Sequence, residues 1–250
     1  MKALVFAAGL GTRLKPLTDS MPKALVPVCG EPLLYHVLTR LRAAGYDEIA
    51  VNVHHFADQI RNYLSENDFG IPILVSDETD LLRETGGGIR HARPFLEGGD
   101  APFLVHNVDI LSDLDLGWFR RHTRPDALAT LLVSERKTQR YFLFDRDMRL
   151  VGWTNIATGE VRSPYPDLDP AQCRRYAFAG IHNISPRIFG VFDGYGCPER
   201  FPIVDFYLRA CAEHPIYGVR PRQLTLVDVG KMETLGEAER IFQQIKDQQI

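Results

Sequence analysis

Residues 3–28 read ALVFAAGLGTRLKPLTDSMPKALVPV, an apolar run followed at once by two glycines. The run at residues 3–8 has the length of one buried β-strand and is too short for a core helix. Gly9 and Gly11 allow the backbone to turn sharply and to approach a ligand without a Cβ in the way. Backbone N–H groups in such a loop can converge on an anion. The stretch therefore predicts a strand that leads into an anion-binding glycine loop.

Two cations and a hydroxyl follow this loop. Arg13 suits phosphate because its planar guanidinium binds two oxygens at once, and Lys23 adds a second positive charge. Thr12 supplies the hydroxyl. Three prolines stiffen the segment and exclude a continuous helix, namely Pro16, Pro22 and Pro27. These features predict a rigid basic arm that faces a ligand with several phosphates.

The loop does not match two common phosphate-binding fingerprints. The dinucleotide fingerprint requires a third glycine at position 14, where Leu14 stands. A P-loop would continue with Gly-Lys-Ser/Thr, which is absent. The sequence therefore disfavours a nicotinamide-dependent oxidoreductase.

The spacing of residues 9–28 resembles the N-terminal signature of the sugar-1-phosphate nucleotidyltransferases. The matching positions are Gly9, Gly11, Thr12, Arg13, Pro16, Thr18, Pro22, Lys23, Leu25, Pro27 and Val28. The resemblance implies a set of nucleotide-binding residues, namely Ala8, Gly9, Gly11 and Thr12. It also implies catalytic roles for Arg13, on the departing pyrophosphate, and for Lys23, on the α-phosphate or the attacking phosphate. It extends over nearly the whole chain.

The composition is that of an ordinary globular protein. The chain has 250 residues, of which 45% are hydrophobic, enough for one sizeable core. A net charge of −3 gives no reason to expect nucleic acid or a membrane as partner. The four cysteines have no zinc-type spacing, and no apolar run is long enough to span a membrane. We expect a cytoplasmic protein that is a monomer or a small homo-oligomer.

Strand and helix patterns alternate through the first half. Strands are expected at residues 3–8, 49–53, 73–75 and 102–109, and helices at 32–45, 56–64 and from 87 toward 95. The second half predicts strands at 127–133, 141–144, 150–153, 177–183 and 225–229, and helical pieces near 189–192, 203–211 and 237–248. This alternation predicts an α/β, Rossmann-like, mostly parallel sheet flanked by helices, with an elaborated sugar-binding second half. We expect one domain over residues 1–250, with a nucleotide-binding half at about 1–115 and a sugar-phosphate-binding half at about 116–250.

Two aspartates follow apolar strand residues. Asp109 ends the strand at 102–109, where ligands bind in open α/β sheets, although an Asp there can also cap a turn. Asp228 lies between two valines, an unusual setting for a strand residue. The segment 227–235 resembles the Asp-Val-Gly segment near the end of the family. By that resemblance, Asp109 and Asp228 are the two carboxylates that hold Mg²⁺. The usual glycine before the first of them is Val108 here.

Three glycines in succession, at 86–88, open the stretch expected to be a helix. They can bring backbone close to a flat ligand, or simply form a flexible loop. The resemblance places such a loop against the nucleotide base. It implies that Thr85, Gly86 and Gly87 lie near the base, with Glu78 as a further candidate.

The sugar side has fewer signals. Residues 178–181 resemble the family's sugar-side strand, in which Gly180 would leave room for the pyranose. Asn155 and Asp205 are candidates for contacts with sugar hydroxyls, or simply a turn residue and a helix-surface residue. The Glu-Lys-Pro segment that supplies a second phosphate-binding lysine in many members is absent, and Arg140 or Lys137 could substitute for it.

The resulting prediction is an Mg²⁺-dependent transferase that joins a nucleotidyl group from an NTP to a sugar 1-phosphate and releases pyrophosphate. The length and glycine loop look most similar to the short N-acetylmuramate-1-phosphate uridylyltransferases, which implies UTP. The alternative is GTP with mannose 1-phosphate or a related sugar phosphate. A non-catalytic nucleotide-sugar-binding regulatory module is the alternative from another class, but it would not need Arg13, Lys23, Asp109 and Asp228 together.

Overall fold

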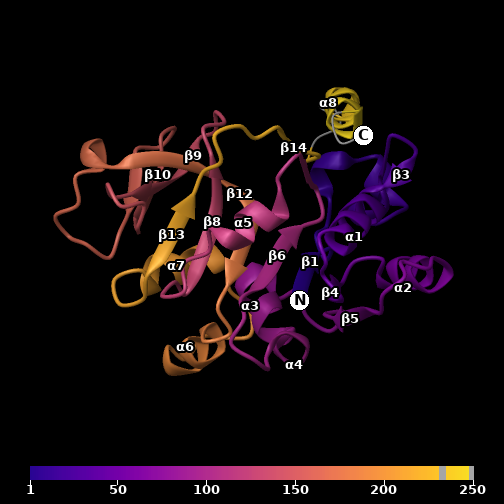
Figure 1. Cartoon of the computed structure of the whole chain (residues 1–250), viewed down its shortest axis with the longest axis horizontal. Coiled ribbons are helices and arrows are strands. Elements are labelled where there is room, and N and C mark those ends of the chain that lie inside the picture. The colour runs from indigo at the N-terminus through magenta and orange to yellow at the C-terminus, as the bar shows by residue number, and fades with distance from the viewer. Residues whose placement is uncertain (231–234, 248–250) are drawn as a thin grey trace.

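The computed structural model describes residues 1–230 and 235–247, and its first strand lies inside a large mixed sheet (Figure 1). β1 (Lys2–Phe6) pairs in parallel with β4 (Glu48–Val53) on one side and β6 (Phe103–Asn107) on the other. β5 (Ile73–Asp77) extends the sheet in parallel beyond β4. Because these strands are parallel, β1, β4 and β6 end at the same edge of the sheet.

The second half of the sheet is mainly antiparallel. β12 (Arg174–Ile184) runs antiparallel to β6 and also pairs with β8 (Ala129–Ser134) and β9 (Arg140–Phe144). The remaining strands are β10 (Leu150–Asn155), β11 (Glu160–Arg162) and β13 (Ile216–Val219), the last parallel to β8. The α/β prediction is confirmed, but the parallel arrangement is confined largely to the first half. Short connections between β9, β10 and β11 impose antiparallel pairing, since parallel strands need a long crossover.

Helices cover both faces of the sheet. One face carries α1 (Leu33–Ala43), α2 (Ala57–Glu66), α5 (Leu116–Arg121) and α8 (Leu235–Asp247). The other carries α3 (Glu84–His91), α4 (Arg93–Leu96), α6 (Ile188–Gly194) and α7 (Ile203–Ala210). Side chains of β1 alternate between two cores, with Ala3 and Val5 in one and Leu4 in the other. This alternation explains the continuous apolar run in the sequence, because both faces of β1 are buried.

Short elements follow β1 and lie among the later strands. The edge of the sheet at which β1, β4 and β6 end is called the active edge below. The arm after β1 forms three 3₁₀ turns, Thr12–Leu14, Leu17–Asp19 and Lys23–Leu25, followed by β2 (Pro27–Val28) and β3 (Glu31–Pro32). A fourth turn spans Pro170–Gln172. β7 (Ile110–Ser112) pairs antiparallel with β14 (Leu226–Asp228). The sequence did not predict β7, α5, β11 or β13, and α3 begins three residues before its expected start at Gly87. Residue 248 of the expected last helix lies outside the described residues.

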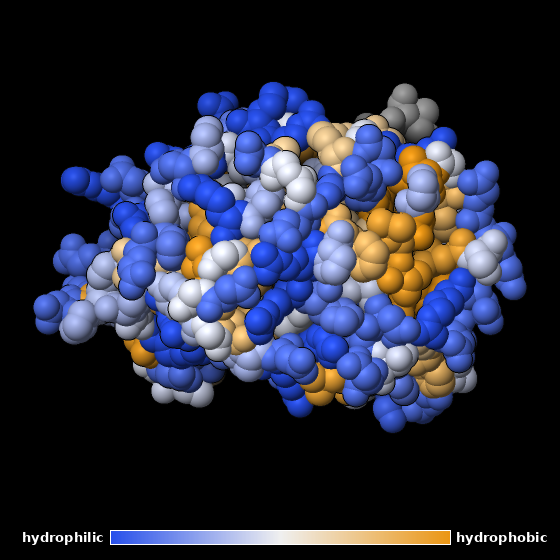
Figure 2. All heavy atoms as spheres, turned by 90° about the horizontal axis from the view of Figure 1, so that it is seen from below, coloured by the Kyte–Doolittle hydropathy of each residue, from blue (hydrophilic) through white to orange (hydrophobic). Residues whose placement is uncertain are grey.

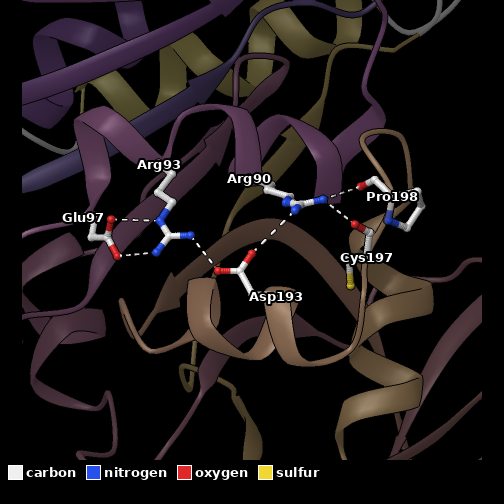
Figure 3. Close-up of polar contacts among 6 residues, drawn as sticks. All are labelled: Arg90, Arg93, Glu97, Asp193, Cys197 and Pro198. Atoms are coloured by element: carbon white, nitrogen blue, oxygen red, sulfur yellow. Dashed lines mark hydrogen bonds and ion pairs between the residues drawn. The ribbon is translucent and has the colours of Figure 1, made fainter.

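An exposed polar network ties the two helices after β5 to α6 (Figure 3). Arg93 forms two hydrogen bonds of 2.8 and 2.9 Å with the Glu97 carboxylate and one of 2.8 Å with Asp193. Arg90 lies 3.5 Å from the other Asp193 oxygen and donates to the Cys197 carbonyl. The network therefore links residues of the first half of the chain to α6 in the second.

The surface opposite the active edge is mostly polar (Figure 2). An apolar area on the right of that view lies toward the end of the sheet where β5 is the last strand. Leu74 of β5 is 38% exposed. Within the described residues, no helix combines the length and the hydrophobicity that crossing a bilayer would require.

Candidate active site

A cavity of about 560 Å³ lies where β1 and β6 end. Most of the residues predicted to bind nucleotide line it, namely Ala8, Gly9, Gly11, Thr12, Glu78 and Thr85. The predicted catalytic and metal-binding residues on its wall are Arg13, Lys23 and Asp109. Asn52, Asn107 and Gly230 also line it, and the sequence analysis did not single them out. The cavity thus brings the N-terminal arm together with residues from four later segments.

The glycine loop is held in shape from two sides. Gly11 has a left-handed φ of +66°, and a Cβ there would lie 2.8 Å from the Thr18 methyl group. The Thr18 hydroxyl donates to the Gly11 carbonyl at 2.8 Å. Gly9 differs, because a Cβ there would meet nothing within 4 Å. Gly11 is therefore required by the fold, whereas Gly9 leaves open space at the cavity wall.

Asn52 joins the glycine loop to the other side of the cavity. Its Oδ1 accepts hydrogen bonds from the Ala7 and Ala8 N–H groups at 2.7 and 3.2 Å, and its Nδ2 donates to Glu78 Oε1 at 2.9 Å. The other Glu78 oxygen accepts from the Arg83 N–H at 3.3 Å. Glu78 is completely buried, and this burial raises the pKa of its carboxyl. The signal that could have revealed Asn52 is a buried amide between two valines in an apolar strand.

Lys23 and Asp109 form an ion pair at the cavity wall. Their side chains are only 10% and 19% exposed, so each charge depends on the other for compensation. Lys23 comes from the third 3₁₀ turn of the arm, and Asp109 from the turn between β6 and β7. The stiff arm therefore brings an ammonium to the aspartate at the active edge.

Asp228 reaches the same edge through the pairing of β7 with β14. It lies opposite Ile110, and the Val229 N–H donates to the Asp109 carbonyl at 2.9 Å. Asp228 Oδ1 is buried and has no hydrogen-bond partner among the described residues. Its Oδ2 lies 3.5 Å from the Arg136 guanidinium. A strand near the end of the sequence thus places a second carboxylate beside the turn that carries Asp109.

Arg13 lies close to this second carboxylate. A Cβ built on Gly230 would lie 2.7 Å from Asp228 Oδ1 and 3.5 Å from the Arg13 guanidinium. Gly230 therefore marks the point at which the arm and the β14 end approach each other. Residues 231–234 of the segment quoted above lie outside the described residues.

The glycines of α3 have a different surrounding from the one expected. The Gly86 and Gly87 N–H groups both donate to the Phe201 carbonyl, at 2.8 and 3.1 Å. A Cβ would lie 2.3 Å from the Phe201 ring at Gly86 and 2.1 Å from the Glu199 carbonyl oxygen at Gly87. Neither residue is among those that line the cavity, and their position near the base stays a prediction. They allow the segment before α7 to pack closely on α3.

Thr85 does line the cavity, although its hydroxyl is already engaged. Thr85 Oγ1 accepts a hydrogen bond from the Ile203 N–H at 2.9 Å at the start of α7. Glu84, which also lines the cavity, has a positive φ of +59°. A non-glycine residue in this region is uncommon. α3 therefore begins with a constrained residue at the cavity wall.

The predicted sugar-side residues are dispersed, and none of them lines the cavity. Arg140 and Asn155 lie opposite each other on β9 and β10, and Asp205 forms an ion pair with Arg162 at 2.9 Å. Gly180 has a φ of +73°, and a Cβ there would lie 2.8 Å from Nδ2 of Asn107, a cavity-lining residue. Among the described residues, Arg136 forms an ion pair with Asp228 at 3.5 Å. The predicted phosphate-binding role of Arg140 or Lys137 stays a prediction. The Asp205 carboxylate is thus already paired with the Arg162 guanidinium.

A profile of the nucleotidyl transferase family matches residues 2–144, more than half of the chain. The N-acetylmuramate alpha-1-phosphate uridylyltransferase of Caulobacter vibrioides is 35% identical over 230 residues, which cover 89% of each chain. This chain belongs to the nucleotidyl transferase family. It is an enzyme of the sugar-1-phosphate nucleotidyltransferase type.

Further relatives of this nucleotidyltransferase belong to two types, which are named for different substrates. The N-acetylmuramate alpha-1-phosphate uridylyltransferase of Neisseria meningitidis is 45% identical over 116 residues, covering 46% of this chain and 49% of its own. A mannose-1-phosphate guanylyltransferase of Arabidopsis thaliana is 39% identical over 119 residues, covering 46% and 33%. Among these three relatives, the one from Caulobacter covers 89% of this chain and the other two cover just under half.

Solved structures show the same fold. HddC from Yersinia pseudotuberculosis, complexed with GMP-PN, has a TM-score of 0.75 at 21% identity, covering 96% of this chain and 99% of its own. The inositol-1-phosphate CTP transferase of T. maritima has a TM-score of 0.76 at 16% identity, covering 98% and 96%. The mixed sheet described above is therefore an arrangement shared with known nucleotidyltransferases.

The donor atoms of this nucleotidyltransferase fit a magnesium ion. The described residues contain no cluster of three His, Cys, Asp or Glu side chains that could hold a metal alone. Mg²⁺ in nucleotide enzymes commonly uses one or two carboxylates and takes its other ligands from water and substrate phosphates. Asp228 Oδ1 is a buried carboxylate oxygen without a partner, and Asp109 lies on the paired turn. Asp109 and Asp228 thus offer the type of oxygen ligand that such an ion prefers.

Proposed function

We propose that this enzyme transfers UMP from UTP to N-acetylmuramate 1-phosphate and releases pyrophosphate. The observation that carries the proposal is the meeting of Arg13, Lys23, Asp109 and Asp228 at one edge of the sheet. The chain also aligns with a uridylyltransferase over 89% of both lengths. A phosphate oxygen of the sugar 1-phosphate attacks the α-phosphorus of the NTP. The bond from that phosphorus to the bridging oxygen breaks, and pyrophosphate leaves.

The residues act mainly by positioning and by neutralising charge, as in other phosphoryl-type transfers. The N–H groups and open space of the glycine loop hold the nucleotide phosphates, together with the Thr12 hydroxyl. Arg13 stabilises the pyrophosphate as its charge grows, and Lys23 neutralises the α-phosphate or the attacking phosphate. No general base is required, because a phosphate monoester is already an anion near neutral pH.

Asp109 and Asp228 are the residues that would hold Mg²⁺ in this reaction. When bound, the ion neutralises phosphate charge and helps to orient the two substrates. Lys23 compensates the Asp109 carboxylate at the cavity wall. Near Gly230, the Arg13 guanidinium lies close to Asp228. The protein therefore surrounds the reacting phosphates with alternating cations and carboxylates.

A guanylyltransferase acting on mannose 1-phosphate is the second candidate, and Glu78 provides a specific reason to keep it. An ionised carboxylate only accepts hydrogen bonds. Guanine presents two adjacent N–H donors on its pairing edge, whereas uracil presents one. Several mannose-1-phosphate guanyltransferases are also similar to about half of the chain. Base identity is accordingly the first property to measure.

The decisive experiment measures pyrophosphate release with each of the four NTPs against a panel of sugar 1-phosphates in the presence of Mg²⁺. We expect the highest kcat/KM for UTP with N-acetylmuramate 1-phosphate. Isothermal titration with UTP and GTP provides a second readout. If GTP binds ten times more tightly than UTP, a difference of about 1.4 kcal/mol, the guanylyltransferase replaces the uridylyltransferase as the favoured function. Nucleotide binding without pyrophosphate release from any pair would indicate a regulatory binding module.

A further inference from the structure

A second cavity, of about 260 Å³, lies at the active edge of the sheet where β8 ends. The segment between β13 and β14 forms its other side. We call it the arginine pocket, and its polar wall consists of Ser134, Glu135, Arg136, Arg220 and Arg222. Leu226, at the start of β14, contributes an apolar side. Three arginines therefore meet one carboxylate in this pocket, next to the strand that carries Asp228.

The charges of the arginine pocket do not balance. Glu135 pairs with Arg220 at 3.1 Å, which accounts for the only carboxylate on its wall. Arg222 forms no ion pair with any described residue. Arg136 is directed partly to Asp228, at 3.5 Å, and partly to the Phe178 carbonyl, at 3.3 Å. An excess of guanidinium groups remains, and guanidinium is well suited to bind a carboxylate or phosphate.

Ser134 provides an independent indication of a ligand. Its Oγ is buried and has no hydrogen-bond partner among the residues that the structure describes. Buried hydroxyl groups in native proteins are rarely left without a partner. Because Ser134 lines the arginine pocket, an acceptor oxygen placed there could satisfy this hydroxyl. The Ser134 hydroxyl without a described partner and the Arg222 guanidinium, on the wall of one small cavity, fit an anion.

Arg136 connects the arginine pocket to the proposed reaction centre. It lines the pocket and also contacts Asp228, one of the two proposed magnesium-binding carboxylates. Leu226 and Asp228 are alternate residues of the same strand. A ligand whose phosphate lies at Asp109 and Asp228 could therefore extend a second group past Arg136 into the pocket.

We propose that the arginine pocket binds a carboxylate on the sugar of the acceptor, so that the enzyme selects an acidic sugar 1-phosphate. This inference rests on the proposed function and assigns residues to the recognition of its acceptor. Arg222 and Arg136 neutralise the carboxylate, and Ser134 donates a hydrogen bond to it. A neutral sugar would leave Arg222 and the Ser134 hydroxyl without a partner among the described residues. Such unpaired polar groups are a strong source of discrimination.

The test compares two acceptors that differ only in the carboxylate-bearing arm. N-acetylmuramate 1-phosphate carries a lactyl ether that N-acetylglucosamine 1-phosphate lacks. We expect the wild-type enzyme to prefer the acidic acceptor by tenfold or more in kcat/KM. Arg222→Gln should reduce this ratio at least fivefold, and Arg222→Lys should retain more of it. Ser134→Ala should reduce the ratio in the same direction.

The control is Arg146→Gln, an exposed arginine outside the arginine pocket whose side chain is 92% exposed. This variant should keep the wild-type ratio. If pyrophosphate is released but Arg222→Gln leaves the ratio unchanged, the pocket proposal is overturned while the proposed function stands. If no sugar 1-phosphate supports turnover, the proposed function fails first. Titration of the metal-loaded enzyme with the acidic acceptor alone then tests the pocket separately, and equal affinity in Arg222→Gln would overturn it.

Discussion

At the scale of single residues, the two carboxylates of the site differ in how their charges are compensated. Asp109 has Lys23 as a direct partner, so removing its charge would also leave a mostly buried ammonium unpaired. Asp228 has one buried oxygen with no partner and a longer contact with Arg136. Asp228 is therefore the better position at which to separate catalysis from stability.

We expect Asp228→Asn to lower turnover by roughly a hundredfold or more, because a neutral amide cannot replace a metal-binding charge. Thermal stability should stay close to wild type, since Oδ1 has no hydrogen-bond partner within residues 1–230 and 235–247. Pyrophosphate release at saturating Mg²⁺ measures the first quantity, and thermal unfolding measures the second. Asp193→Asn, which changes an exposed carboxylate outside the cavity, should retain full turnover. Wild-type rates in Asp228→Asn would remove this residue from the site.

Substitutions at two glycines should distinguish an effect on protein stability from an effect on nucleotide binding. Gly87→Ala would place a Cβ 2.1 Å from the Glu199 carbonyl oxygen, which should lower the free energy of unfolding by roughly 1–3 kcal/mol. Gly9→Ala meets nothing within 4 Å and should leave unfolding almost unchanged. Because Gly9 lines the cavity, its variant should instead raise the KM for NTP. Urea unfolding and steady-state kinetics of both variants check this contrast, and the reverse pattern would contradict it.

At the scale of elements, the site depends on hydrogen bonds between the ends of neighbouring strands. Asn52, at the end of β4, bonds both to the loop after β1 and to Glu78 after β5. The amide supplies acceptor and donor at once, so three segments share one side chain. This explains why a polar residue is buried in an apolar strand.

Asn52→Ala should lower the free energy of unfolding by about 2 kcal/mol or more, because buried N–H groups and a carboxylate lose their partner. It should also raise the KM for NTP, since Ala8 and Glu78 both line the cavity. Asn62→Ala on the exposed surface of α2 is the matched control and should change neither property. An unchanged KM in the Asn52 variant would show that the amide supports the fold alone.

The sequence predicted those parts of the site that depend on local pattern. The apolar run before Gly9 predicted β1, and the spacing of the arm predicted that Arg13 and Lys23 face one cavity. Local pattern could not reveal that Gly86 and Gly87 pack against the segment before α7, because that contact joins residues far apart in the chain. Arg136 was missed for the same reason, since its contact with Asp228 exists only after β14 pairs with β7.

At the scale of the whole molecule, two buried histidines make stability depend on pH. Burial lowers the pKa of His106 to about 4 and that of His182 to about 3, from an ordinary value of 6.5. They lie on the neighbouring strands β6 and β12. Since the unfolded chain binds these protons more readily, their stabilising contribution is complete above pH 6.5 and is lost as the pH falls toward the folded values.

Between pH 6.5 and 5 the free energy of unfolding should therefore fall by about 1.4 kcal/mol per pH unit for each histidine. Glu78 acts in the opposite sense nearer its own range, because burial raises the pKa of its carboxyl. Urea unfolding at several pH values measures the slope. His106→Leu should reduce the slope of the unfolding free energy against pH by the contribution of one titrating group. Replacing the exposed His122 by Leu should leave this slope unchanged. Equal slopes in all three proteins would contradict this account.

The pairing of β14 with β7 also has a consequence for the order in which a ribosome makes this protein. Every strand of the large sheet is complete by Val219, and Lys23 can meet Asp109 as soon as β6 and β7 have emerged. Asp228 is translated later than all of these strands. A growing chain thus holds a finished nucleotide loop while the second proposed carboxylate is still missing. The proposed reaction centre is complete only when β14, a strand of three residues, pairs with β7. We therefore expect that a polypeptide that lacks β14 does not hydrolyse or transfer nucleotide.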